Sequence, residues 1–363
     1  MKVINIISDT NIGGAGKCLI SYIDNYEKKF DIIVYIPEKS LLKNKLDERN
    51  IAYRELPYIN EMSFNKNAIS HLIESFKIDK PDIVHCHATF SGRLAAKIYG
   101  TKIIYTRHSY FEQNKSNSIK TKIKNIINNY LCHIAIAVSP ATKINLLETG
   151  IDSGKIRIVY NGVDKLKKYN DEGIKNAKKK YGTETDFNIT ILARLEEVKG
   201  HKYVLECATK LKEYPDIKFL IAGTGTEEEK LKEIINNLKL KNVNILGFVN
   251  NVEELLNATD IQINCSYGTE ATSLALLEGM SIGIPAIVSD FGGNPYVIKN
   301  GYNGYTYPVH TTNELYENIL ILYNNKNIYN RISENSITEY NNRFTSKVMA
   351  NEITKVYEEA FKL

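Results

Sequence analysis

Short apolar runs alternate along this chain with longer stretches that suit helices. The runs lie at 3–7, 31–36, 83–85, 103–105 and 134–138, and again at 188–192, 218–222, 243–246, 261–264 and 285–288. Their length and near-continuous apolar character are typical of buried parallel strands. Because helix-length segments separate them, the pattern predicts βαβ units and an α/β fold with two doubly wound parallel sheets.

Turn-forming residues replace this pattern at Asn161-Gly162-Val163-Asp164 and in the Lys-rich stretch that follows. We therefore expect one domain over 1–164, a second over 165–345 and a helix over 346–363. A chain of 363 residues exceeds what one hydrophobic core usually organises, which agrees with two domains. Parallel sheets bind ligands at the carboxyl ends of their strands, so two facing sheets predict a cleft for two substrates.

The composition is that of an ordinary globular protein, with 43% hydrophobic and 25% charged residues. These values exclude disordered, collagen-like and coiled-coil chains. The five cysteines form no Cys-x-x-Cys pair, and the first residues, MKVINIISDT, lack the features of a signal peptide. Every apolar run is also too short to cross a bilayer. We expect a cytoplasmic protein, attached at most peripherally to the inner face of the cell membrane.

The net charge is +5, and the basic excess lies in the first half of the chain. Such an excess suits nucleic acid, anionic lipid, a phosphorylated substrate or simply a solvated surface. The sequence has no zinc-ligand set and no basic motif interleaved with aromatic residues, so we expect no nucleic-acid partner. Charge alone leaves the other three interpretations open.

A glycine-rich loop, Gly13-Gly14-Ala15-Gly16-Lys17, follows the first predicted strand, where phosphate-binding loops occur. A P-loop would need other residues than Asn11 and Cys18, and a dinucleotide fingerprint would need glycine in place of Leu19. The loop is then either a tight structural turn or a flexible loop that closes over a substrate, and we favour the second. Gly223-Thr224-Gly225-Thr226 is a similar turn, for which a purely structural role is equally open.

The segment over 260–293 carries the densest candidate chemistry. A strand leads into Glu270, and a helix should begin near Thr272 or Ser273, since both are good N-caps. The N–H groups and positive dipole end of such a helix suit a diphosphate, while Glu278, on the second turn, points a carboxylate toward a ribose beyond it. The structural alternative is a capping or solvated Glu270 and a hydrogen-bonded Glu278 in the core.

Several motifs together resemble one enzyme family. They are Glu270 and Glu278 with seven residues between them, Gly283-Ile284-Pro285, Ser289-Asp290-Phe291-Gly292-Gly293, Ala193-Arg194-Leu195 with Lys199-Gly200, Leu246-Gly247-Phe248, Asn303-Gly304 and Asn161-Gly162-Val163-Asp164. In this combination the chain resembles the retaining GT-B glycosyltransferases of family GT4, the glycosyl transferases group 1, over nearly its whole length. The resemblance implies two Rossmann-like domains that face each other across a cleft.

The resemblance also implies roles for the domains and for ten residues. Residues 1–164 would be the acceptor-side domain, 165–345 the nucleotide-sugar domain, and 346–363 a helix that crosses back to the first. The catalytic set would be His108, Arg194, Lys199 and Glu270, and the donor-binding set Gly13, Gly14, Thr272, Ser273, Leu274 and Glu278. Arg194 and Lys199 would stabilise the leaving diphosphate, with a surface ion pair as the structural alternative. Because no Asp-x-Asp motif occurs, we expect no metal and no cofactor.

Three histidines need separate assignments. Thr106-Arg107-His108-Ser109 follows a predicted strand and looks like the family's His motif, whose imidazole reaches the donor sugar. Ser109 replaces the Asp that is common there, so the identity of the sugar stays open. His85 and His87 have no acidic or further Cys partner nearby, and we expect no zinc site. They are either core or loop histidines or residues that line the acceptor side.

The stretch from Lys115 to Leu131 combines isoleucines at helical spacing with Lys120, Lys122 and Lys124, and it predicts a basic amphipathic helix. One interpretation is an ordinary domain helix with its apolar stripe in the core. The other is a surface that rests on anionic lipid and presents a lipid-linked acceptor. The basic excess of the same domain favours the second.

We therefore expect a retaining, metal-independent hexosyltransferase. It would move a hexose from a nucleotide-diphosphate sugar to a hydroxyl of a glycan or lipid-linked acceptor, in cell-surface polysaccharide or glycolipid synthesis. Its expected partners are the nucleotide sugar, that acceptor and an anionic membrane surface. Two alternatives stay open: a non-hydrolysing nucleotide-sugar epimerase, which would need acid and base residues near the sugar, and a non-catalytic glycan-binding protein.

Overall fold

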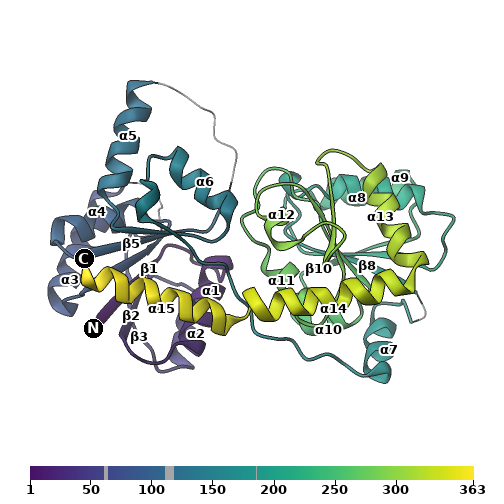
Figure 1. Cartoon of the computed structure of the whole chain (residues 1–363), viewed down its shortest axis with the longest axis horizontal. Coiled ribbons are helices and arrows are strands. Elements are labelled where there is room, and N and C mark those ends of the chain that lie inside the picture. Colours follow the sequence, from purple (N-terminus) through teal and green to yellow (C-terminus); the bar gives the residue numbers. More distant parts are fainter. Residues whose placement is uncertain (61–63, 111–117, 185) are drawn as a thin grey trace. The chain divides into compact units, whose positions relative to one another are not determined.

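The computed structural model describes residues 1–60, 64–110, 118–184 and 186–363, and Figure 1 shows the course of the chain. The chain divides into two compact units. Unit 1 comprises Met1–Gly162 together with Ser346–Leu363, and unit 2 comprises Val163–Thr345. The segment that begins at Ser346 thus packs with the first part of the chain.

Unit 1 is built on a seven-stranded parallel sheet with the order β3-β2-β1-β4-β5-β6-β7. Its strands are β1 (Lys2–Ile7), β2 (Asp31–Pro37), β3 (Ala52–Leu56), β4 (Ile83–His87), β5 (Lys102–Arg107), β6 (Ile134–Ala137) and β7 (Ile156–Ile158). The order of the strands reverses between β1 and β4. Loops that leave the carboxyl ends of these two strands diverge, which is where open α/β sheets hold ligands.

Helices connect the strands of unit 1. They are α1 (Gly14–Asn25), α2 (Leu42–Asp47), α3 (Lys66–Asp79), α4 (Phe90–Tyr99), α5 (Ile119–Tyr130), α6 (Pro140–Glu148) and the last helix of the chain, α15 (Ser346–Lys362), with a 3₁₀ turn at Ser153–Lys155. Helix α15 packs on α1, where Ser21 and Ser346 share a hydrogen bond of 2.9 Å and Tyr22 meets Tyr357 edge to face. The chain's last helix therefore completes the core of unit 1.

Unit 2 repeats the same principle with six parallel strands in the order β10-β9-β8-β11-β12-β13. The strands are β8 (Phe187–Leu192), β9 (Ile217–Ala222), β10 (Val243–Gly247), β11 (Ile261–Asn264), β12 (Ala286–Ser289) and β13 (Gly304–Tyr307). Here the order reverses between β8 and β11. The two sheets confirm the predicted fold class, and the pattern missed only strands at sheet edges: β3, β7 and β13.

The helices of unit 2 cover both faces of its sheet. They are α7 (Asp171–Lys180), α8 (His201–Lys210), α9 (Glu228–Asn237), α10 (Val252–Asn257), α11 (Leu274–Ser281), α12 (Asn294–Val297), α13 (Asn313–Asn324) and α14 (Lys326–Arg343), with a 3₁₀ turn at Glu197–Lys199. The largest core cluster joins central strands to α8 and α13 through buried side chains such as Phe219, Leu205 and Ile319. Within the described part of the chain, no helix is long and apolar enough to span a membrane.

One partly buried ion pair ties the edge of the first sheet to its covering helix. Asp79, at the end of α3, accepts hydrogen bonds from the Tyr35 hydroxyl at 2.6 Å and from the Arg54 guanidinium, whose Nη2 lies 2.6 Å from Oδ1. The Asp79 side chain is only 10% exposed, and the neighbouring Arg54 holds its pKa below the ordinary value of 3.8.

We expect Asp79→Asn to lower the free energy of unfolding by about 2 kcal/mol, because it removes a charged acceptor from the buried Tyr35 hydroxyl and the half-buried Arg54 guanidinium. Since the pKa of Asp79 is lowered on folding, its stabilisation is present above about pH 4 and disappears as the pH falls through the lower folded value. Urea unfolding of the full chain at neutral and acidic pH measures both effects.

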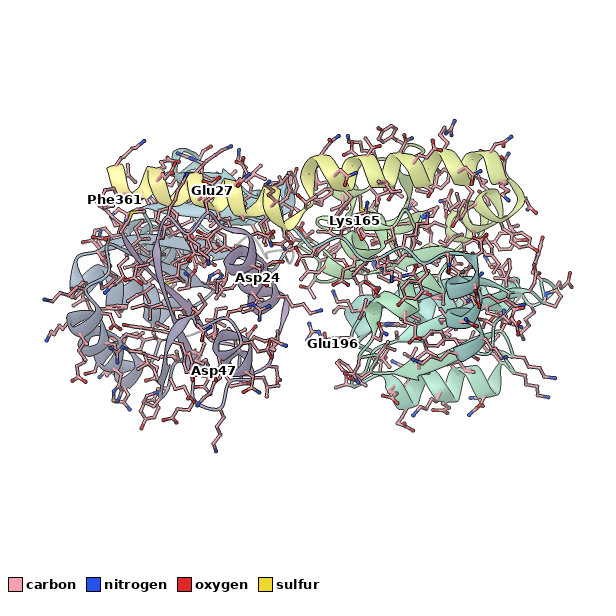
Figure 2. The ribbon with its side chains drawn as sticks, turned by 90° about the horizontal axis from the view of Figure 1, so that it is seen from below. Asp24, Glu27, Asp47, Lys165, Glu196 and Phe361 are labelled. Carbon is pink, nitrogen blue, oxygen red and sulfur yellow. The ribbon has the colours of Figure 1, made fainter. Side chains whose placement is uncertain are left out.

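The matched control is Asp24→Asn. Asp24, labelled on α1 in Figure 2, pairs with Arg49 at 2.6 Å, but these side chains are 35% and 26% exposed. An exposed pair of this kind contributes less than about 1 kcal/mol. Equal losses for the two variants would contradict the assignment of Asp79 as a buried anchor.

Candidate active site

A lysine and a glutamate meet at the switch point of the second sheet. Lys199 lies in the loop after β8 and Glu270 in the loop after β11, and the Nζ of Lys199 is 3.1 Å from Oε2 of Glu270. Their side chains are only 13% and 9% exposed. Lys199 also donates to the backbone carbonyl of Thr269 at 2.8 Å. The structure thus brings together two residues that the sequence placed 71 positions apart.

Three donors converge on one oxygen of the Glu270 carboxylate. Besides Lys199, the amide of Asn264 and the hydroxyl of Ser266 donate to Oε2, each at 3.1 Å. A buried carboxylate is stable only when its charge is met in this way. Every one of these bonds goes to Oε2, so Oε1 is the oxygen that can receive a hydrogen bond from a ligand.

Glycines let the surrounding loops approach one another closely. A Cβ on Gly200 would lie 2.1 Å from the Cys265 carbonyl oxygen, one on Gly268 would lie 2.6 Å from Val198, and one on Gly293 would lie 1.7 Å from the Ala271 carbonyl oxygen. Gly200 also has a φ of +72°, a conformation that favours glycine. These approaches hold the Lys199 loop and the Glu270 loop in place.

Helix α11 begins next to Glu270. Its N-cap is Ser273, whose Oγ accepts from the N–H of Leu276 at 3.3 Å, so the helix begins where the sequence predicted. Thr272 is buried beside it, Leu274 is the first helical residue, and Glu278 lies half-buried on the second turn. The positive end of the helix dipole is thus close to the Lys199–Glu270 pair, which suits an anionic ligand.

Arg194 lies on the same β8 loop but is not part of this pair. Its side chain is 68% exposed and ion-pairs with Glu196 at 2.6 Å (Figure 2 labels Glu196). Gly223 and Gly225 support this loop, because a Cβ on either would lie within 2.3 Å of the carbonyl oxygen of Ala193 or Leu195. This close approach gives the predicted Gly223–Thr226 turn a structural role.

Three polar residues of the network around Glu270 were not predicted from the sequence. Asn264 and Ser266 donate to it, and Asn294 reaches Asn264 at 3.4 Å and Ser289 at 3.1 Å. The only available signal was positional: Asn264 ends an apolar strand, and Asn294 opens α12 right after the Gly292-Gly293 turn.

In unit 1, the Gly-rich loop follows β1 and ends at the N-cap of α1, Gly13, which makes no side-chain capping bond. Gly14 is the first residue of α1. A Cβ on Gly13 would lie 2.8 Å from Oδ2 of Asp9, so the glycine makes room for that carboxylate. Burial raises the pKa of Asp9. The loop therefore combines uncapped helical N–H groups with an acidic side chain.

All three candidate histidines lie in one hydrogen-bonded chain at the switch point of the first sheet. His87 Nδ1 lies 2.9 Å from His108 Nε2, and His87 Nε2 lies 3.2 Å from Asn5 Oδ1. The hydroxyl of Tyr357, on α15, donates to the same oxygen of Asn5 at 3.1 Å and lies 2.8 Å from His85 Nδ1. His85 and His87 are thus buried core residues that reach the candidate residue His108.

This chain assigns the ring hydrogens. With Asn5 Oδ1 as acceptor, His87 carries its hydrogen on Nε2, and its Nδ1 accepts from Nε2–H of His108. The Nδ1 of His108 is then an acceptor. Burial lowers the pKa of His108 to about 4 and that of His85 to about 3, so both rings are neutral at pH 7. Among the described residues, no cluster of three His, Cys, Asp or Glu side chains is arranged to hold a metal ion.

Comparison with known proteins assigns both units to sugar-transfer families. Residues 12–165 match the family model described as Glycosyltransferase Family 4, and residues 173–339 match that of the Glycosyl transferases group 1. Together the two models cover most of unit 1 and nearly all of unit 2.

Two relatives and one solved structure illustrate the match. The UDP-Gal:alpha-D-GlcNAc-diphosphoundecaprenol alpha-1,3-galactosyltransferase of Escherichia coli is 29% identical over 91% of this chain and 89% of its own length. The alpha-monoglucosyldiacylglycerol synthase of Acholeplasma laidlawii is 27% identical over 71% of this chain and 70% of its own. The crystal structure of HepE from Anabaena in complex with UDP-glucose has a TM-score of 0.87 and 19% identity, over 99% of this chain and all of that one.

The close approach at Gly293 can be tested directly. We expect Gly293→Ala to lower the free energy of unfolding by about 2 kcal/mol, because the new methyl group overlaps the Ala271 carbonyl and must displace the backbone beside Glu270. The control is Gly154→Ala, at a position where a Cβ meets nothing within 4 Å. Urea unfolding compares the two; a Gly293→Ala variant as stable as the control would contradict the tight backbone contact.

Proposed function

The chain belongs to the family 4, group 1 glycosyltransferases and has their GT-B fold, and from this premise we propose that it is a retaining, metal-independent hexosyltransferase with a nucleotide-diphosphate sugar as donor. The observation that carries the proposal is the nearly buried Lys199–Glu270 pair beside the N-terminus of α11. This is a cationic and dipolar setting next to a carboxylate, which is what a diphosphate bound to a sugar requires.

The donor's diphosphate binds at the start of α11 in this proposal. The N–H groups near Thr272, Ser273 and Leu274 meet the phosphates, and the ammonium of Lys199 stabilises the charge that develops as the nucleoside diphosphate leaves. Arg194 adds its guanidinium by exchanging Glu196 for a phosphate oxygen. Because these two cationic side chains supply this charge, the reaction needs no metal ion.

The remaining candidates contact the ends of the donor. Glu278, on the second turn of α11, accepts from the ribose hydroxyls, and Oε1 of Glu270 accepts from hydroxyls of the sugar. Nδ1 of His108 accepts from another sugar hydroxyl and orients the ring. Gly13 and Gly14 allow the loop before α1 to close on the donor.

The state of Glu270 argues against a covalent glycosyl-enzyme intermediate as the route to retention. Its carboxylate already accepts from three donors at Oε2, including an ammonium, and this reduces its strength as a nucleophile. We infer that the acceptor hydroxyl attacks from the face that the diphosphate leaves, within a short-lived ion pair, and gives its proton to an oxygen of the leaving diphosphate, so that the anomeric configuration is kept.

The acceptor is a hydroxyl of a glycan or of a lipid-linked sugar. The relatives in Escherichia coli and Acholeplasma laidlawii are named for a diphosphoundecaprenol-linked sugar and for a diacylglycerol glycolipid. A lipid-linked acceptor would place the enzyme at the cytoplasmic face of a membrane, in polysaccharide or glycolipid synthesis.

The comparisons do not favour an epimerase or a non-catalytic glycan-binding protein. An epimerase of this plan would exchange the proton at C2 of the sugar, so incubation of the donor in deuterium oxide separates the two reactions. Deuterium at C2 would indicate epimerisation; release of nucleoside diphosphate without deuterium at C2 indicates transfer.

We expect one preferred donor when release of nucleoside diphosphate is measured with UDP-, GDP-, ADP- and dTDP-sugars in the presence of EDTA. Glu278→Ala should raise KM for that donor by about tenfold or more, because a charged hydrogen bond to the ribose is lost, with a smaller effect on kcat.

The control for this variant is Glu229→Ala, which removes a highly exposed glutamate of α9 in the same unit. Its KM should equal that of the wild type. A wild type that uses none of the four donors, or a Glu278→Ala variant that matches the control, would overturn the proposed donor site.

A further inference from the structure

Helix α5 packs on unit 1 with its polar side. Asn128 donates to the backbone carbonyl of Thr149 at 3.2 Å and accepts from Arg93 at the same distance. Asn129 bonds to the side chain and the backbone of Asp152. None of the residues of α5 is buried. The helix, at the edge of unit 1 beside α6 in Figure 1, is therefore held by asparagines rather than by apolar side chains.

The apolar stripe of α5 faces solvent. Its members lie at helical spacing along one side: Ile119, Ile123, Ile126, Ile127 and Tyr130 are 76%, 52%, 69%, 42% and 63% exposed. This corrects the interpretation of an ordinary helix with its stripe in the core. The part of the predicted helix before Ser118, from Lys115, lies outside the described residues. Five large apolar side chains in one exposed row are typical of an interaction surface.

Lysines border this stripe. Lys120, Lys122 and Lys124 are exposed, and helical geometry places Lys122 on one side of the isoleucines and the other two on the opposite side. The helix contains no acidic residue. Apolar side chains flanked by cations are typical of a helix that lies in the plane of an anionic membrane surface.

A basic pocket adjoins the C-terminal end of the stripe. It is lined by Tyr130 of α5 and by Lys97, His133, Lys155 and Arg157, among others. Lys97 Nζ lies 4.1 Å from the centre of the Tyr130 ring, so the stripe and the pocket are continuous. Arg157 is neutralised by Glu359, which lines the pocket together with Leu363. Lys97 and Lys155 take part in none of the ion pairs found between described residues, and Lys155 donates to the backbone carbonyl of Asn129 on α5 at 2.7 Å.

His133 lies among the positive charges of this pocket, and its pKa is lowered. Burial lowers its pKa, and the charges of Lys97, Lys102 and Lys155 lower it further. Its Nδ1 accepts from the backbone N–H of Ile103 at 2.9 Å, so the neutral ring carries its hydrogen on Nε2. The ring is thus a neutral donor among lysines, and this donor set suits a phosphate oxygen.

We propose that α5 and the pocket at its C-terminal end form one binding site for anionic phospholipid, in which the stripe enters the membrane interface and the pocket holds a headgroup phosphate. A second copy of the chain fits this surface less well, because a symmetric contact would bring the lysines of two α5 helices together. This proposal rests on the proposed function in one respect: a lipid-linked acceptor explains why the enzyme binds a membrane.

The test is flotation of the full chain with vesicles of phosphatidylcholine alone and with added phosphatidylglycerol. The wild type should float with the anionic vesicles, and Ile126→Ser should bind them about tenfold less well. The matched control is Ile78→Ser on α3, an isoleucine of unit 1 that is 66% exposed, which should bind like the wild type. Thermal midpoints of both variants verify that they are folded.

A second pair of variants tests the pocket. Lys97→Gln with Lys155→Gln should reduce binding to the anionic vesicles by about tenfold and leave binding to neutral vesicles unchanged, whereas Lys77→Gln on α3 should change neither. Inorganic phosphate that binds in the pocket of a chain that floats with no vesicle would assign the pocket to a soluble ligand and overturn the lipid site.

Three further results bear on the proposal separately. Wild-type chain that stays with the soluble fraction would overturn it, as would a dimer in solution that Ile126→Ser converts to monomer. Donor hydrolysis by the wild type without vesicles is measured in parallel and tests the proposed function alone. A failure to bind vesicles is therefore distinguishable from a failure to hydrolyse the donor.

Discussion

A buried carboxylate needs hydrogen-bond donors to balance its charge, and at Glu270 this requirement organises the site of unit 2. Lys199 reaches one carboxylate oxygen from the loop after β8, and Asn264 and Ser266 reach the same oxygen from the end of β11 and the loop that follows it. The loops that carry them approach closely at glycines: a Cβ at position 200 or 293 would overlap a backbone carbonyl oxygen, and one at position 268 would overlap the Val198 side chain. The position of Glu270 therefore depends on the glycines and on the hydrogen-bond network together, next to the start of α11. The result is a carboxylate with one oxygen fixed and one available.

Unit 1 meets a similar requirement with neutral groups. Its histidines are buried at the carboxyl ends of β4 and β5, where charged imidazolium would be costly, and their pKa values are lowered accordingly. A chain of hydrogen bonds through Asn5 and Tyr357 satisfies them instead. Tyr357 belongs to the last helix of the chain, which explains why that helix is part of the first unit's core. Packing and the orientation of His108 are thus coupled.

Much of this architecture could be predicted from the sequence, and the failures have physical reasons. All central strands were found because burial on both faces makes them continuously apolar, whereas the edge strands β3, β7 and β13 carry polar residues and give no such signal. Glu270 was singled out by its place between a predicted strand and a helix, and Lys199 by the family resemblance. Neither signal indicated Asn264 or Tyr357, since polar partners of a buried group leave no pattern along the chain. For α5 the stripe was evident, and its direction was not, because periodicity cannot say which side of a helix meets the protein.

The most direct test of the central claim is the anomeric configuration of a product formed without metal. The preferred donor is incubated with the enzyme, EDTA and methanol as a surrogate acceptor, and proton NMR of the anomeric signal identifies the methyl glycoside, which cannot interconvert after release. The account predicts a methyl glycoside with the same anomeric configuration as the donor. An inverted product, or a product that forms only after a divalent metal ion is added, would contradict it.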